Sequence, residues 1–389
     1  MADSNASSLG SSSREPAAAA APRPSLDPLA CRQRQARLCR ELAVLGVGRA
    51  LLTSPENIQY LTGFRPHPLL HAALCLETDG KCTLAAPNEQ PEGAAFDRCA
   101  VYPAQHRATL RQDQRTEAVR ALRGAVENLS GKVAVEWQAA GLEAAVWVDG
   151  QTSRWVAVDE TLWRLRRKKD PDELAMIRTA IGCTDAMYAR ARDIIAPGVT
   201  ELHVFEQLHA AAVEFAGEPL TALGNDFQCG TPGGPPRRRA AAAGELFILD
   251  LGPAYRGYYA DNCRTFAVDR RPTDEQLRAW ESVVAVLAHV ERRVRPGASC
   301  RALFDEAQAA LDASGSGSFF HHLGHGFGLY PHEAPRLNPQ WDDVFAEGDC
   351  FTAEPGLYAP GLRGGIRLEQ DYVVTADGVE RLTHYPLEL

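Results

Sequence analysis

The sequence predicts an α+β protein with two domains: a smaller N-terminal α/β domain and a larger C-terminal domain whose helices cover a mostly antiparallel sheet. The length of 389 residues exceeds what one ordinary hydrophobic core supports. The 45% of apolar and 23% of charged residues are typical of globular proteins. In the C-terminal part, helical and strand-like runs follow one another as blocks, which favours antiparallel pairing over repeated βαβ units.

The N-terminal elements begin after a low-complexity segment. Residues 1–25 are rich in Ala, Ser, Pro and Gly and are expected to be a disordered extension, with an export or targeting leader as the alternative. The domain that follows is expected over 26–160. Its expected elements are a helix over 27–45, a strand over 49–53, a helix capped by Ser54, a hairpin over 72–86, a strand over 132–137 and a short helix over 142–148.

The C-terminal domain is expected over 161–389. The basic run at 164–169 near its start is expected to be a solvated linker, with an anion site as the alternative. Asp170, Pro171 and Glu173 form a capping box for its first helix. The other expected elements are a helix from Thr200 to Gly217, strands over 245–251 and 258–268, helices over 273–294 and 300–313, and a strand-rich stretch over 350–384. A second basic run, 237–239, is expected on the face of a loop, with contacts to acidic groups as the alternative.

Composition excludes several classes of protein. The formal net charge of −9 argues against a nucleic-acid partner, and the absence of a long apolar run argues against a membrane span. Neither a phosphate-binding G-x-x-x-x-G-K-[ST] loop nor a G-x-S-x-G nucleophile elbow occurs. The 10 cysteines are scattered without any C-x-x-C motif, which favours buried, reduced thiols in a cytoplasmic protein.

Two aspartates lie in strand-like, apolar surroundings. Asp250 stands in the apolar run Ile248–Leu249–Asp250–Leu251, and Asp261 follows eleven residues later. A carboxylate in a buried strand is costly unless it is paired or binds a cation. Two strands joined by a hairpin would bring both carboxylates together, and a bound metal ion would remove their repulsion.

Histidine and glutamate complete the pattern. Four histidines cluster in HHLGHGFGLYPHE, at positions 321, 322, 325 and 332, and Glu354 and Glu369 stand in later strand-like segments. Two Asp, one His and two Glu in strand contexts indicate a carboxylate-rich site for two divalent metal ions. Such a set of ligands binds Mn, Co, Fe or Zn. Two neighbouring metal ions can activate water and clamp a tetrahedral intermediate.

Four motifs resemble those of the pita-bread metallopeptidases, which comprise methionine aminopeptidase, aminopeptidase P and prolidase. These motifs are LDLG…ADNCRTF, HHLGHGFGLYPHE, TAEPGLY and GIRLEQD, and the resemblance covers about 164–387. The segment SPENIQYLTGF at 54–64 resembles the creatinase-type N-terminal domain, which points to the aminopeptidase P, prolidase and creatinase branch. The resemblance implies a pita-bread fold for the C-terminal domain and a homodimer.

The resemblance also implies a role for each matching residue. Asp250 would chelate one metal ion, Asp261 and Glu369 would bridge both, and His325 and Glu354 would complete the other shell. Glu354 would in addition carry the proton of the attacking water. His332 would stabilise the scissile carbonyl, and His321 would place the substrate. Arg367 would hold carboxylates of the site, and Tyr358 would donate a supporting hydrogen bond. His322 is expected to have no role.

One position departs from the family pattern. The family commonly carries a histidine in a loop before the first Asp ligand, and that position is Gly233 here, with no histidine nearby. A different substrate, a reduced activity and compensation by Arg237–Arg239 are all compatible with this departure.

The sequence thus predicts a metal-dependent hydrolase that uses two divalent metal ions, Mn most of all, to cleave the Xaa-Pro bond of small peptides. The first alternative is a related non-peptidase that hydrolyses a C–N bond in a small amide. The second is a non-catalytic binding protein on the same fold.

Overall fold

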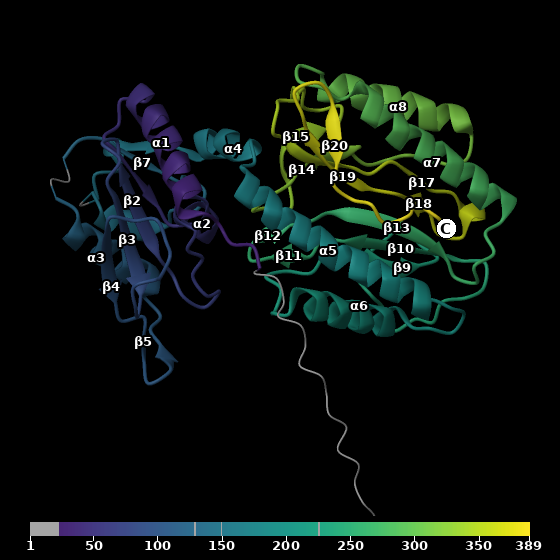
Figure 1. The fold of residues 1–389 in the computed structure, drawn as a ribbon, viewed down its shortest axis with the longest axis horizontal. Coiled ribbons are helices and arrows are strands. Elements are labelled where there is room, and N and C mark those ends of the chain that lie inside the picture. The colour runs from purple at the N-terminus through teal and green to yellow at the C-terminus, as the bar shows by residue number, and fades with distance from the viewer. Residues whose placement is uncertain (1–22, 128–129, 149, 225) are drawn as a thin grey trace, which may run out of the picture.

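The computed structural model describes residues 23–127, 130–148, 150–224 and 226–389. The predicted extension over 1–25 lies outside these residues except for its last three. Two domains follow one another along the chain, and helix α4 (Asp159–Arg167) leads from the first to the second (Figure 1). Among the helices described, none combines the length and the apolar character that a membrane span needs.

The N-terminal domain is built on one mixed sheet of six strands in the order β4-β3-β2-β1-β7-β8. Its strands are β1 Arg49–Leu52, β2 Ala73–Glu77, β3 Cys82–Pro87, β4 Arg98–Tyr102, β7 Val133–Val135 and β8 Trp155–Ala157, with a separate ladder of β5 Gln105–His106 and β6 Thr109–Leu110. Its helices are α1 Pro28–Val44, α2 Pro55–Thr62 and α3 Gln114–Ala125, with 3₁₀ turns η1 Leu142–Val146 and η2 Thr152–Arg154.

Local chemistry accounts for the elements that the sequence predicted in this domain. Asp27 and Ser54 accept hydrogen bonds from the backbone at the first turns of α1 and α2, each followed by a proline in that turn. The predicted hairpin over 72–86 is confirmed as β2 and β3, paired in antiparallel register. The short helix predicted over 142–148 is a 3₁₀ turn. Helix α3 and the strands β4, β5, β6 and β8 were not predicted.

The C-terminal domain packs its sheets between two helix pairs, with α5 and α6 on one side and α7 and α8 on the other (Figure 1). These helices are α5 Pro171–Ile194, α6 Glu201–Ala216, α7 Asp274–Arg293 and α8 Cys300–Ser314. The larger sheets run β13-β10-β9 and β15-β14-β16-β19-β20, and every strand pair in the domain is antiparallel, as predicted.

The strands of this domain carry the residues of interest at their ends and centres. They are β9 Asp226–Cys229, β10 Leu246–Leu251, β11 Ala254–Tyr255, β12 Tyr258–Tyr259, β13 Asn262–Ala267, β14 Gly324–Gly326, β15 Glu333–Leu337, β16 Cys350–Ala353, β17 Gly356–Leu357, β18 Ile366–Arg367, β19 Gln370–Val374 and β20 Val379–Arg381, with a 3₁₀ turn η3 Pro360–Leu362. The predicted capping boxes of α5 and α7 are both present. The 10 cysteines are free thiols, and all but Cys99 are buried.

Both basic runs differ from a simple solvated surface. Arg166 and Lys169 are buried, and each forms an ion pair with Glu333 at 3.1 Å, so the prediction of a solvated linker over 164–169 is wrong for them. In the second run, Arg237 and Arg239 form ion pairs with the carboxylates of Glu201 and Glu245. For the run 237–239, the alternative prediction of contacts with acidic groups is therefore confirmed.

The capping residue Glu173 provides a test of stability against pH. Burial raises the pKa of Glu173 from its ordinary 4.5 to about 7. The folded chain then holds this proton more tightly than the unfolded chain, so the wild-type free energy of unfolding falls between pH 4.5 and 7, by up to about 3 kcal/mol. In urea titrations, Glu173→Gln should gain stability relative to wild type over that window.

Asp172 is the matched control, because its shift has the opposite sign. Burial opposes the change, but hydrogen bonds from Arg34 hold the pKa of Asp172 below its ordinary 3.8. Its contribution to stability is present above pH 3.8 and is lost as the pH falls through the lower, folded-state pKa. Asp172→Asn should therefore be less stable than wild type above pH 3.8 and approach it at lower pH. A stability difference for Glu173→Gln that does not change with pH would refute the argument.

Candidate metal centre

Five predicted side chains converge between the two larger sheets of the C-terminal domain. Each is at most 9% exposed. They are Asp250 within β10, Asp261 just before β13, His325 at the centre of β14, Glu354 just after β16 and Glu369 just before β19. Since β10 pairs with β13 in antiparallel register, the hairpin brings the two aspartates together as predicted.

The ligand atoms form two adjacent groups that share one carboxylate. One oxygen each from Asp250, Asp261 and Glu369 lie within 4.8 Å of one another. One atom each from His325, Glu354 and Glu369 form a second group within the same distance. Two groups that meet at Glu369 provide places for two neighbouring cations, and the oxygen-rich donor set suits hard divalent metals.

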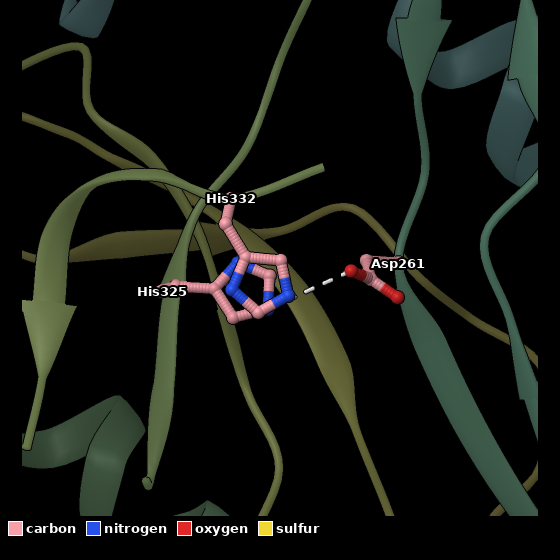
Figure 2. A group of neighbouring side chains, drawn as sticks. All are labelled: Asp261, His325 and His332. Carbon is pink, nitrogen blue, oxygen red and sulfur yellow. Dashed lines mark ion pairs between the residues drawn. The ribbon is translucent and has the colours of Figure 1, made fainter. Parts of the chain in front are cut away.

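The orientation of His325 leaves one ring nitrogen free for a cation. Its Nδ1 lies 3.0 Å from the Gly326 carbonyl oxygen, which accepts a hydrogen bond from it. Its Nε2 points toward Asp261, 3.6 Å from Oδ2 (Figure 2). The same nitrogen lies 3.7 Å from Glu354 Oε1. Burial lowers the pKa of His325 to about 3, so the imidazole is neutral near pH 7, the form that binds metals.

The buried carboxylates repel one another. Burial, followed by the charges of Asp250 and Glu354, raises the pKa values of Asp261 and Glu369 well above their ordinary range. Glu369 Oε1 accepts a hydrogen bond of 2.6 Å from Thr352, but its buried Oε2 has no hydrogen-bond partner among the described residues. Such an oxygen is costly to bury, and a divalent cation in the cluster would satisfy it, so the residues present fit metal ions.

The other histidines of the cluster lie beside His325. The ring of His332 stacks on it with centroids 3.6 Å apart (Figure 2). The His322 ring lies beside this pair, with its centroid 5.2 Å from that of His325 and 5.6 Å from that of His332. Its Nε2 lies 2.8 Å from Glu354 Oε1. His322 therefore contacts a candidate ligand, while its expected lack of a role stays a prediction. No spacing rule marked this position, because β14 and the segment after β16 meet only in the fold.

His321 and Tyr358 are linked at the edge of the cluster. Nε2 of His321 lies 2.8 Å from the Tyr358 hydroxyl, which is also 3.5 Å from Arg367 Nη1. The other ring nitrogen of His321 lies 2.9 Å from the His322 carbonyl oxygen. The supporting hydrogen bond expected of Tyr358 is thus present, and it fixes the orientation of the His321 ring.

Arg367 joins two carboxylates on neighbouring strands. Its Nη2 lies 2.9 Å from Asp250 Oδ2 and also binds Asp226, a residue of β9 that stands directly opposite Asp250 in the sheet register. Asp226 was not predicted. Asp226 explains why position 233 is a glycine, because a Cβ there would lie 2.2 Å from Asp226 Oδ2. The φ of +146° at Gly233 also disfavours any residue with a side chain. Arg237 and Arg239 are engaged by Glu201 and Glu245, so compensation by this run has no support in the geometry.

A double-mutant cycle tests this coupling. Gly233→Ala should destabilise the protein strongly, because it combines backbone strain with the collision against Asp226. In an Asp226→Ala background the same change should cost less, by about 1 kcal/mol or more, since only the strain remains. Urea unfolding of the four proteins gives the coupling. Additive effects would show that Asp226 does not occupy the space beside Gly233.

A cavity of about 520 Å³ opens on the histidines and is lined by both domains. The N-terminal domain contributes Asn57, Glu136, Gln138 and Ala139, α4 contributes Asp159, Trp163 and Arg166, and the C-terminal domain contributes His322, His325, Tyr330, His332, Glu333, Ala334, Arg336, Asn338 and Trp341. Its size is that of a small-molecule or short-peptide site.

Ion pairs across this cavity hold the loop that carries His332. The next residue, Glu333, pairs with the buried cations Arg166 and Lys169. Burial opposes the change, but these two charges lower the pKa of Glu333, so it is ionised near neutral pH. The Tyr330 hydroxyl donates a hydrogen bond of 3.0 Å to Glu56 of the N-terminal domain. The loop is therefore anchored on both sides of His332.

Comparisons with known proteins agree with this geometry. The model of metallopeptidase family M24 matches residues 175–376, and the model of the creatinase/prolidase N-terminal domain matches residues 34–168. The dipeptidase candidate YkvY of Bacillus subtilis is 28% identical over 369 residues, which span 91% of this chain and 98% of that protein.

Solved structures share the fold over nearly their whole length. The prolidase from Pyrococcus horikoshii superposes with a TM-score of 0.76 at 22% identity, covering 92% of this chain and 99% of that one. The Xaa-Pro dipeptidase from Bacillus anthracis gives a TM-score of 0.74 at 22% identity with the same coverage. At this identity the likeness shows the α+β pita-bread architecture with its creatinase-like N-terminal domain.

Proposed function

The chain belongs to metallopeptidase family M24 and is a metal-dependent hydrolase, and from this premise we propose that it uses two divalent metal ions to cleave the Xaa-Pro bond of small peptides. The observation that carries the proposal is the pair of ligand groups that share Glu369 beneath a cleft lined by His322, His325 and His332. In this proposal, residues 26–160 shape the substrate cleft and residues 161–389 carry the chemistry.

The five converging side chains would hold the metal ions. Asp250 would bind one, His325 and Glu354 the other, and Asp261 and Glu369 both. The bound ions would act as Lewis acids that polarise the scissile carbonyl and activate a water molecule. Four carboxylates with one imidazole favour Mn²⁺ as the native metal, ahead of Co²⁺, Zn²⁺ and Fe²⁺.

Glu354 is the residue proposed to move the proton. Burial opposes the change, but the imidazole of His322 and then its histidine neighbours hold the pKa of Glu354 below its ordinary value, so it is available as a carboxylate. It would accept a proton from the attacking water and deliver it to the leaving nitrogen, whose bond to the carbonyl carbon breaks in the same stage. His322, at 2.8 Å, would orient this carboxylate.

His332, His321 and Arg367 are proposed to stabilise charge on the substrate or to hold other groups in position. The His332 ring, held by its anchored loop, would donate a hydrogen bond to the carbonyl oxygen as negative charge develops there. His321, oriented by Tyr358, would place the substrate. Arg367 would keep Asp250 in position through their 2.9 Å ion pair.

Features of the cleft support a short peptide as the substrate. The volume of about 520 Å³ is closed on one side by the N-terminal domain. The Arg336 side chain lines it and is 42% exposed. Although it pairs with Asp343 at 3.4 Å, it offers further donors to the carboxylate end of a peptide. The ten unpaired thiols, nine of them buried, suit the cytoplasm, where small peptides arise from protein turnover. A homodimer, in which a second copy would help to close the cleft, is part of the proposal.

A peptide panel tests the proposal directly. Purified protein reconstituted with Mn²⁺, Co²⁺, Zn²⁺ or Fe²⁺ is assayed against Xaa-Pro dipeptides and against longer peptides with proline in second position. Release of proline, or of the first residue, supports a dipeptidase or an aminopeptidase respectively. No turnover with any of the four metals would exclude the peptidase.

The alternative of a non-peptidase C–N hydrolase rests on Gly233 and Asp226. Gly233 stands where the family has a histidine, and the carboxylate of Asp226 lies beside it and binds Arg367. The wall of the site next to Asp250 therefore differs from that of the family. Turnover of small amides without turnover of peptides would favour this alternative. A non-catalytic binding protein has less support, because all five candidate ligands are present and converge.

A further inference from the structure

Two tryptophans stand in the cleft with their indole rings partly in water. Trp163 on α4 is 36% exposed, and Trp341, in the loop between β15 and β16, is 54% exposed. Both line the cavity that His322, His325 and His332 line. Single exposed aromatic side chains are ordinary on protein surfaces, but two in the same cavity as a candidate catalytic cluster indicate a ligand-binding surface.

The loop that carries Trp341 is ordered. Backbone N–H groups of Gln340 and Trp341 donate hydrogen bonds of 2.8 and 3.1 Å to Asn338 Oδ1. The guanidinium of Arg336 lies 5.3 Å from the Trp341 ring centroid, and the Arg336 backbone N–H donates to Asp343. An aromatic side chain held in place this way loses little conformational entropy when a ligand packs on it.

Both indoles keep exposed surface for a ligand, although Arg336 covers part of the Trp341 ring. Within the described part of the chain, neither ring N–H donates a hydrogen bond and neither ring contacts another aromatic ring. We propose that Trp163 and Trp341 form a subsite that binds an apolar side chain of the substrate beside the scissile bond. This inference rests on the proposed peptidase function and adds the class of side chain that the enzyme prefers.

Charged side chains of both signs line the cavity around the indoles. The carboxylates of Glu136 and Asp159 also line the cleft, and both accept hydrogen bonds from neutral donors, such as Asn57 to Glu136 and the backbone N–H of Trp137 to Asp159. Neither forms an ion pair with a described residue. The positive charges of Arg166 and Arg336 lie in the same cavity, so charge alone does not select the side chain. Leucine and phenylalanine should be preferred over aspartate because they bury apolar area against the indoles.

The test compares two peptide series, Xaa-Pro and Ala-Pro-Xaa, with Leu, Phe, Asp or Lys at Xaa. The wild-type enzyme should prefer Leu and Phe over Asp in at least one series. Trp341→Ala, and more so Trp163→Ala/Trp341→Ala, should raise KM for the apolar peptides by about tenfold and leave kcat nearly unchanged. KM for the Asp peptides should change little.

Trp137→Ala is the matched control, because Trp137 is 62% exposed but does not line the cavity, and it packs on Trp155. An unchanged Leu/Asp preference in the double variant, or an equal loss in Trp137→Ala, would overturn the inference. So would a change of oligomeric state by light scattering in Trp341→Ala, since the indole would then belong to an interface.

A binding measurement separates this inference from the proposed function. Calorimetric titration of Phe-Pro or Asp-Pro into metal-loaded Glu354→Gln protein measures binding affinity without turnover. Tighter binding of Phe-Pro that disappears in the Trp163→Ala/Trp341→Ala background supports the subsite even if no peptide is hydrolysed. Peptide hydrolysis with equal affinity for both ligands would leave the peptidase in place and remove the subsite.

Discussion

Glu354→Gln is expected to lower kcat/KM for Xaa-Pro peptides by about a thousandfold or more while the protein stays folded. The substitution keeps the shape of the side chain and the neighbouring histidines but removes the carboxylate proposed to accept the proton, which is also a proposed metal ligand. General-base catalysis alone is worth about 10² to 10⁴ in rate, and loss of metal-ligand charge adds to this. The measurement is steady-state kinetics with a saturating divalent metal, together with metal content of the purified variant.

Glu347→Gln is a suitable control, because Glu347 lies seven residues earlier in the same part of the chain and is exposed. It should retain wild-type kinetics. The metal content of Glu354→Gln distinguishes the two contributions, because Asp250, Asp261 and Glu369 still form one complete group. A variant that keeps more than a tenth of wild-type kcat/KM would show that another residue carries the proton.

Local sequence chemistry was enough to predict most of the elements that position the centre. The boxes Asp170–Glu173 and Thr273–Gln276 marked the starts of α5 and α7, and Thr200 and Gly217 the ends of α6, because capping depends on residues a few positions apart. The four carboxylates could be selected because a carboxylate within an apolar strand is conspicuous. His325 was distinguished from the three other histidines of its motif only by the family resemblance, and the structure brings all five side chains together.

Residues that act through distant partners could not be found in this way. Asp226 has no local peculiarity, and its place beside Asp250 depends on the pairing of β9 with β10. Arg166 and Lys169 look like surface charge until Glu333, more than 160 residues later, is placed against them. The cleft itself combines three segments of the chain, so neither Trp163 nor Trp341 could be assigned to it from sequence spacing.

Removal of metal is expected to destabilise the wild-type protein and to reverse the order of stability between wild type and Asp261→Asn. Without cations, the buried carboxylates of Asp250, Asp261 and Glu369 lie within 4.8 Å of one another and repel. At a free metal concentration of about 100 times Kd, binding adds about 2.7 kcal/mol to the free energy of unfolding. This corresponds to several degrees in melting temperature. With Mn²⁺, wild type should melt higher than Asp261→Asn, whereas with a chelator Asp261→Asn should melt higher.

The pH dependence of this reversal follows from the raised pKa of Asp261. Burial and then the charges of Asp250 and Glu354 raise it above its ordinary 3.8, so the metal-free wild-type protein loses stability as the pH rises from about 3.8 toward the folded-state pKa. The asparagine variant lacks this loss, and its advantage in chelator should therefore be larger at pH 8 than at pH 5. Thermal melts at both pH values measure the difference, and Asp305→Asn, an exposed residue of α8, should show none of it. If Asp261→Asn melts below wild type in chelator at pH 8, then repulsion does not dominate in the empty cluster, and its carboxylates are held by hydrogen bonds rather than by metal ions.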